Sequence, residues 1–154
     1  MPYHPTRLIA AVDGSEDASR AAAMAAGLAK EMNRPLTLLY VFPAPGPHEF
    51  VSLDSVTGAL TDPAALSPQG LEEASRKAAA TVFAAARKAI GDSVDVEERI
   101  ATGPVVPEIL KAAEALKPAL VVVGRRGLGR LGEFLLGSVS NKLVHQHAFP
   151  VLVV

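Results

Sequence analysis

The chain has 154 residues, of which 49% are hydrophobic and 20% are charged; this length and composition predict one folded domain over residues 1–154 and exclude disorder over most of the chain. Its 15 basic and 16 acidic side chains give a formal net charge of −1, which disfavours general nucleic-acid binding, and the lack of cysteine excludes disulfides, thiolate metal sites and cysteine nucleophiles. No apolar run approaches the ~20 residues of a membrane helix, and residues 1–6 carry no signal-peptide pattern, so we expect a cytoplasmic protein with no membrane partner.

Apolar periodicity divides the chain into alternating strands and helices. Apolar runs rich in β-branched residues predict strands, and apolar residues at helical spacing predict helices. In chain order we expect strand 8–12, helix 16–32, strand 36–42, helix 72–90, strand 94–100, helix 105–116, strand 119–123, helix 138–145 and strand 149–154. Strands joined by helical crossovers form a parallel sheet with helices on both faces, so an α/β fold is predicted.

Three local features add detail to this alternation. Ser15 or Asp17 is suited to cap the helix that begins at residue 16. Residues 43–70 are rich in proline, serine and glycine and predict a long connection, which in a compact domain is usually functional or disordered. The strand expected over residues 94–100 carries charges at a density that is typical of a sheet edge.

The ends of two predicted strands carry the residues best suited to bind a ligand. Open α/β sheets bind ligands beyond the carboxyl ends of their strands, where the winding reverses. The turn Asp13-Gly14-Ser15 follows the first strand, and the glycine-rich loop that begins at Gly124 follows the fourth. We therefore expect a binding site between these two segments.

The glycine-rich loop has the character of a polyphosphate site. The glycines of its spacing pattern stand at 124, 127 and 137, and Ser138 follows directly at the start of a helix. Glycines let the backbone approach an anion, and the helix start offers N–H donors with about half a positive charge. The loop also contains Arg125, Arg126 and Arg130. It is not a P-loop, because no lysine follows the last glycine.

The spacing Gly124-x2-Gly127-x9-Gly137-Ser138 resembles the ATP-binding signature of universal stress proteins. The opening residues 9–15 are similar to that family's first strand and turn, and residues 150–154 to its last strand. The resemblance covers nearly the whole chain; Ala119 departs from it, because members often carry an acidic residue just before the fourth strand. It implies a Rossmann-like five-stranded sheet of order 3-2-1-4-5 and a homodimer joined through the terminal strand, Val151 to Val154.

The same resemblance implies an adenine-nucleotide site that takes ATP with Mg²⁺ or Mn²⁺. Asp13 would meet the nucleoside or the metal-hydrated phosphates, and the metal would be held mainly through the phosphates. Val41, at the end of the second strand, would hydrogen-bond adenine through its backbone. The residues expected to bind the nucleotide are Ala11, Asp13, Ser15, Val41, Val123, Gly124, Arg125, Gly127, Gly137, Ser138, Val139 and Ser140.

Two interpretations of the function remain open from the sequence. The first is an ATP-binding, nucleotide-responsive regulatory dimer of the stress response, with at most weak hydrolysis because no histidine or second carboxylate is placed beside the phosphates. The alternative is a nucleotide-free dimerisation or interaction module of the same fold, in which the glycine loop is only a structural turn and Asp13 only a helix cap. A phospho-accepting receiver domain is disfavoured, because the third strand lacks an aspartate at its end.

Overall fold

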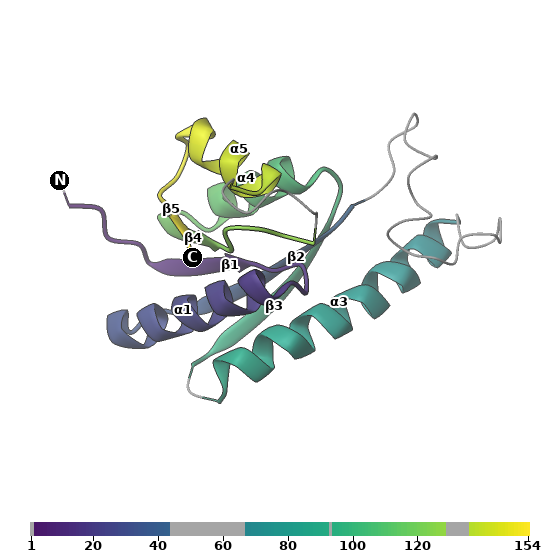
Figure 1. The fold of residues 1–154 in the computed structure, drawn as a ribbon, viewed down its shortest axis with the longest axis horizontal. Coiled ribbons are helices and arrows are strands. Elements are labelled where there is room, and N and C mark those ends of the chain that lie inside the picture. Colours follow the sequence, from purple (N-terminus) through teal and green to yellow (C-terminus); the bar gives the residue numbers. More distant parts are fainter. Residues whose placement is uncertain (1, 44–66, 93, 129–135) are drawn as a thin grey trace.

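The described residues form a five-stranded parallel sheet in the order β3-β2-β1-β4-β5, which confirms the predicted strand order. The structure is a computed structural model, and it describes residues 2–43, 67–92, 94–128 and 136–154. Its elements in chain order are β1 (Arg7–Ala11), α1 (Glu16–Met32), β2 (Leu36–Phe42), α3 (Pro68–Ile90), β3 (Val96–Thr102), α4 (Val105–Ala115), β4 (Ala119–Val123), α5 (Ser138–Gln146) and β5 (Val151–Val153) (Figure 1).

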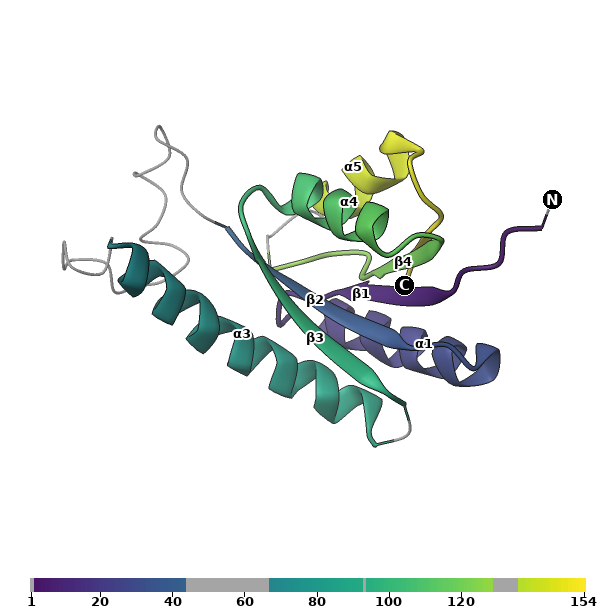
Figure 2. The same cartoon turned by 180° about the vertical axis from the view of Figure 1, so that it is seen from behind.

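Two helices cover each face of the sheet. Helices α1 and α3 lie on one face and α4 and α5 on the other, an arrangement that both views show (Figure 1, Figure 2). The strand β1 lies at the centre and supplies both cores: Leu8 and Ala10 pack toward α1 and α3, and Ile9 packs toward α4 and α5. Burial on both faces is the reason that the strand is a continuous apolar run.

Helix α1 packs against the sheet through small side chains. Its buried residues are all alanines: Ala18, Ala21, Ala22, Ala25, Ala26 and Ala29. Alanine also favours the helical backbone. The helix begins at Ser15, whose side chain accepts a hydrogen bond from the N–H of Ala18, and it ends at Asn33 in the left-handed conformation. This settles the choice of N-cap between the two residues predicted for it.

Helix α3 begins four residues earlier than the sequence predicted. Ser67 caps it by accepting a hydrogen bond from the N–H of Gly70, and Pro68 occupies the first helical position, where its missing N–H costs nothing. Residues 68–70 therefore belong to the helix and not to the predicted connection. Residues 44–66, the rest of that connection, lie outside the described part of the chain.

The two edges of the sheet differ in charge. The edge strand β3 begins and ends two residues later than predicted, and its charges were correctly expected at an edge. Glu97 receives hydrogen bonds from Arg99 at 2.7 Å and Arg7 at 2.6 Å; the bond from Arg99 is the main reason that the pKa of Glu97 is lowered. The opposite edge, β5, is short, apolar and half-buried.

The other element boundaries agree with the sequence-based ones to within two residues, including those of β5, which the sequence placed over residues 149–154. In the described residues, no helix has the length and apolar character required to span a membrane.

Candidate functional site

A cavity of about 210 Å³ opens at the carboxyl ends of the central strands. Strand β1 pairs with β2 on one side and with β4 on the other, so the direction of winding reverses between β1 and β4. This is the position at which open α/β sheets bind ligands. The cavity is lined by Ala11, Val12, Asp13, Ala18, Leu39, Val41, Val105, Ile109, Val123, Gly124, Arg126, Gly127, Leu128, Gly137, Ser138, Val139 and Ser140.

The structure gathers ten of the twelve predicted site residues around this cavity. They are Ala11, Asp13, Val41, Val123, Gly124, Gly127, Gly137, Ser138, Val139 and Ser140. The two that do not line it have structural contacts instead. Ser15 caps α1. The backbone of Arg125 joins three segments: its N–H donates to the carbonyl of Val154 at 2.7 Å, and its carbonyl accepts from the N–H of Gly137 at 2.8 Å.

Asp13 bridges the turn after β1 and the loop after β4. One carboxylate oxygen, Oδ1, accepts from the N–H of Ser15 at 2.9 Å, and the other, Oδ2, accepts from the N–H of Leu128 at 3.1 Å. The interpretation of Asp13 as the cap of α1 is therefore wrong, since Ser15 holds that position. Burial, with a smaller contribution from the charge of Asp13, raises the pKa of Tyr40.

The three described glycines of the loop each stand close to a neighbouring segment. A Cβ at Gly124 would lie 2.6 Å from the carbonyl carbon of Asp17, so the first turn of α1 can approach the end of β4 only if residue 124 has no side chain. A Cβ at Gly127 would lie 2.5 Å from Oδ2 of Asp13, and one at Gly137 would lie 3.2 Å from the carbonyl oxygen of Arg125. At Gly124, close packing of backbone on backbone explains the glycine without any ligand.

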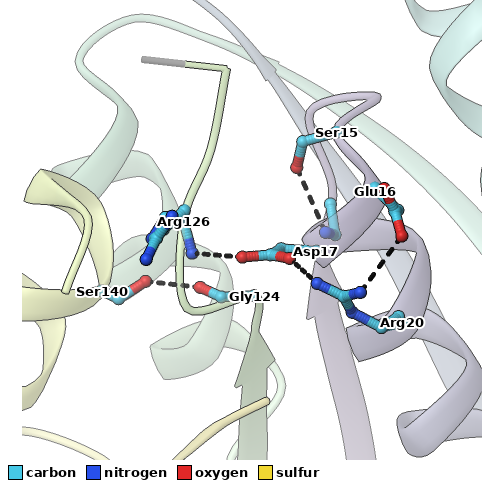
Figure 3. Close-up of polar contacts among 8 residues, drawn as sticks. Ser15, Glu16, Asp17, Arg20, Gly124, Arg126 and Ser140 are labelled. Carbon is cyan, nitrogen blue, oxygen red and sulfur yellow. Dashed lines mark hydrogen bonds and ion pairs between the residues drawn. The ribbon is translucent and has the colours of Figure 1, made fainter. Parts of the chain in front are cut away.

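Helix α5 begins at the cavity without a side-chain cap. Its N-cap is Gly137, which has no side chain to accept from the first N–H groups, and its first turn contains no acidic residue. Ser140 uses its buried hydroxyl to donate to the carbonyl of Gly124 at 2.6 Å, which fixes the helix to the end of β4 (Figure 3). The start of this helix therefore borders the cavity with N–H donors and the positive end of its dipole.

One wall of the cavity is apolar and comes largely from residues that the sequence analysis did not select. Leu39 and Val41 are two residues apart on β2, so their side chains lie on the same face of the sheet. Val105 and Ile109 are about one turn apart on α4, so they also lie on one face. Because side chains two positions apart in a strand share a face, the selection of Val41 could have led to Leu39 as well. The contribution of α4 to the cavity wall depends on which face of the sheet the helix covers, and no local sequence pattern indicates that.

The arginines of the loop have different positions. Arg126 lines the cavity, which agrees with its selection as a source of positive charge. Arg130 belongs to residues 129–135, which lie outside the described part of the chain. The described site thus combines an apolar wall, a carboxylate, an arginine and an uncapped helix start. Such a site suits a ligand with an apolar end and an anionic end.

Comparison with known proteins agrees with the fold and with the resemblance to the universal stress protein family. Residues 5–154 match the model of the universal stress protein family. The chain is 33% identical over 148 residues to universal stress protein YxiE of Bacillus subtilis (strain 168), covering 96% of this chain and 97% of that one. It is 30% identical over 170 residues to stress response protein NhaX of the same strain, covering 99% of each.

Solved structures share the fold. The universal stress protein UspA from Lactobacillus plantarum superposes with a TM-score of 0.71 at 24% identity, covering 100% of this chain and 99% of that one. A universal stress protein in complex with cAMP gives 0.60 at 24% identity, with 97% of each chain covered. The Archaeoglobus fulgidus protein in complex with dAMP gives 0.59 at 20% identity, with 99% and 98% covered. By its sequence over nearly its whole length, the chain belongs to the universal stress protein family.

Proposed function

We propose that this chain binds ATP in the cavity and acts as a nucleotide-responsive regulator of the stress response. The observation that carries the proposal is the uncapped start of α5 beside the cavity, where backbone N–H groups and the helix dipole favour an anion. Relatives support the class of ligand, because two structures of the same fold are complexes with cAMP and dAMP. Both of those molecules contain adenine and a phosphate group.

In the proposed complex, the base occupies the apolar end of the cavity and the phosphates lie toward α5. Leu39 and Ile109 offer apolar contact to the base, and the backbone of Val41 offers it a hydrogen bond. Ligand pockets commonly measure about 300–1,000 Å³. Since this cavity is about 210 Å³, a complete nucleotide would extend from its mouth, with its phosphates along the glycine loop and Ser138.

A divalent cation, Mg²⁺ or Mn²⁺, accompanies the phosphates in this proposal and neutralises part of their charge. Asp13 supplies the one carboxylate among the described cavity-lining residues. The described residues contain no cluster of three or more metal-ligating side chains. This set fits an ion that is bound through nucleotide oxygens, water and one carboxylate, which is an arrangement that Mg²⁺ commonly adopts. Asp13 is the protein ligand that we assign to it.

Hydrolysis of ATP is expected to be weak. A general base must reach the attacking water with a free acceptor. Among the described lining residues Asp13 is the single candidate; each of its oxygens accepts one backbone N–H group, and the acceptor capacity that remains is assigned to the metal ion in this proposal. Asp13 is therefore better suited to holding the loop than to abstracting a proton.

Two copies of the chain pair through β5 in the same proposal. Strand β5 is bonded to β4 and is the last strand in the sheet order. An apolar edge that is left unpaired favours aggregation, and antiparallel pairing with a second copy would cover it. Sedimentation should give twice the chain mass of 16.0 kDa. A single monomeric species at micromolar concentration would contradict the dimer.

Nucleotide binding is tested directly on the purified chain. Nucleotides released by denaturation are identified by chromatography and mass spectrometry, and Mg-ATP is titrated into the nucleotide-free protein by calorimetry. Saturable binding of ATP, with or without co-purified nucleotide, is the expected result. No released nucleotide and no saturable binding would reject the proposal, and a nucleotide-free interaction module of the same fold would then be the function to test.

A further inference from the structure

Asp17 joins the first turn of α1 to the loop after β4. Its Oδ2 accepts a hydrogen bond from the N–H of Arg126 at 3.1 Å, and its Oδ1 pairs with the guanidinium of Arg20 (Figure 3). The Asp17 side chain is 14% exposed, whereas the neighbouring Glu16 side chain is 87% exposed. Both acidic residues pair with Arg20, but it is Asp17 that also contacts the loop.

This contact is fixed by the packing of the backbone around it. Gly124 has no side chain, so the first turn of α1 lies directly against the end of β4. Asp17 is therefore held at its position by the helix and needs no rotation of a long side chain to reach the loop. A contact that is already formed before a ligand arrives costs no ordering entropy when the ligand binds.

The segment that Asp17 holds is the one expected to meet phosphate. Arg126 lies between Gly124 and Gly127, and all three residues line the cavity. Asp13 holds the same segment two residues farther on, through the N–H of Leu128. Two carboxylates from the β1–α1 region thus anchor the backbone at residues 126 and 128. With these N–H groups occupied by Asp17 and Asp13, the orientation of the peptide units between them is fixed.

The charge of Asp17 is compensated locally. A free carboxylate beside a phosphate site would repel the ligand. The guanidinium of Arg20 lies against this carboxylate, and the N–H of Arg126 adds a second favourable contact. Asp17 can therefore act as a hydrogen-bond acceptor for the loop without presenting a full negative charge to the site.

We infer that Asp17, compensated by Arg20, is a positioning residue that holds residues 124–128, the described start of the loop proposed to bind phosphate, in the binding conformation. The inference rests on the proposed nucleotide site. It assigns a function to a residue that lies outside the cavity lining and outside the glycine motif. Removing the Asp17 carboxylate should weaken only the binding of the phosphate part of the ligand, because the apolar wall of the cavity comes from β2 and α4.

The test compares dissociation constants for Mg-ATP and for adenosine, measured by calorimetry on the unmodified chain and on Asp17→Ala, Asp17→Asn and the control Glu16→Ala. Asp17→Ala should weaken ATP binding about tenfold, the size of one hydrogen bond to a charged group, and adenosine binding less than about threefold. Asp17→Asn keeps an acceptor oxygen and should restore most of the ATP affinity. Glu16→Ala should leave both constants unchanged.

Hydrogen exchange of the Arg126 amide provides a readout that does not depend on the ligand. It should be faster in Asp17→Ala than in the unmodified chain and unchanged in Glu16→Ala. If Asp17→Ala folds poorly, Arg20→Gln serves as the second variant. It leaves the Asp17 carboxylate uncompensated and should weaken ATP binding, more at low salt, with adenosine binding unaffected.

Three results would overturn the inference. Equal losses for ATP and adenosine would mean that Asp17 only stabilises the fold. Unchanged ATP binding and unchanged amide exchange in Asp17→Ala would mean that the contact is not formed in solution. An unmodified chain that binds no ATP would reject the nucleotide site itself, and with it any positioning for phosphate. Binding by the unmodified chain separates failure of the proposed function from failure of this inference.

Discussion

Helices α1 and α5 both begin beside the cavity, yet their first turns are built in opposite ways. Helix α1 has a serine N-cap that accepts from the N–H of Ala18, and its first turn contains Glu16 and Asp17. Helix α5 has Gly137 as its N-cap, no side-chain cap and no acidic residue in its first turn. The two helices therefore offer very different surroundings to a ligand at the same edge of the sheet.

The difference shows which helix end is available to an external anion. The positive end of α1 is already balanced by the chain's own oxygens, which is the usual way to stabilise a helix start. The positive end of α5 lacks this compensation, and its stability there depends on the hydrogen bonds of Ser140 and Gly137 with the backbone of the β4 loop. We expect phosphate at α5 and none at α1.

Adding a negative charge to α5 should have the largest effect. Ser138 is exposed at the first helical position. Ser138→Asp should lower ATP affinity by about 100-fold, near 3 kcal/mol, because a carboxylate would face the phosphates. The same change should leave the melting temperature equal or higher, since an acidic first turn stabilises a helix. Calorimetry and thermal unfolding measure the two effects.

The control for this variant is Asn141→Asp, which places the same charge farther along the same exposed helix surface. It should change ATP affinity by less than about threefold, because Asn141, unlike Ser138, does not line the cavity. Equal ATP binding by Ser138→Asp and the unmodified chain would remove α5 as the anion site.

Adding a side chain where α1 packs against the end of β4 should have the next largest effect. This effect is on the stability of the fold. Gly124→Ala brings a Cβ to 2.6 Å from the backbone of Asp17, and no side-chain rotation can relieve a clash with backbone. We expect a loss of about 2 kcal/mol in the free energy of unfolding, as for other overpacked sites. Urea denaturation measures it.

Gly27→Ala provides the matched comparison, because Gly27 lies in the same helix and a Cβ there meets nothing within 4 Å. It should raise stability by about 0.5–1 kcal/mol through helix propensity. If both variants changed stability in the same direction, the close approach of α1 to β4 would be contradicted.

The cap of α1 should account for a smaller part of the stability. Ser15→Ala removes the oxygen that accepts from Ala18 and should cost about 1 kcal/mol in the free energy of unfolding. Ser138→Ala should cost much less, because no cap bond is lost at α5. Chemical unfolding of the two variants in parallel tests the contrast. Equal losses would show that the two helix starts are not built differently.

The ionisation of Glu97, at the opposite end of the sheet from the cavity, should have the smallest effect on stability. It should have no influence on nucleotide binding. The pKa of Glu97 is lowered, first by its hydrogen bond from Arg99, so the folded chain holds this proton less tightly than the unfolded chain. The resulting stability is present above the ordinary glutamate pKa and is lost as the pH falls below it. Because the side chain is 42% exposed, the effect is small.

The measurement is the free energy of unfolding between pH 3 and pH 7 for the unmodified chain and for Glu97→Gln. The variant should show a weaker decline at acid pH and the same ATP affinity at neutral pH. An identical pH dependence would contradict the assigned cause of the shift.

Local patterns predicted most of the fold, but one local signal was missed and one contact between distant residues could not be predicted. Apolar runs located the central strands, and the glycine spacing led to most residues around the cavity. The start of α3 was missed although Ser67-Pro68 is a typical helix start, because it lies in a proline-rich segment that favoured a loop. The contact between Asp17 and Arg126 joins residues far apart in the chain, so it depends on the strand order and on the missing side chain at 124.

The central place of β1 also has a consequence for synthesis on the ribosome. Strand β1 can pair with β2 early, but its other partner, β4, begins only at Ala119. Pairings of such long sequence separation form late. The part of the cavity wall that comes from β4 and from the start of α5 is therefore missing until residues 119–140 have emerged. We expect a nascent chain to acquire the proposed nucleotide site only after α5 has been made.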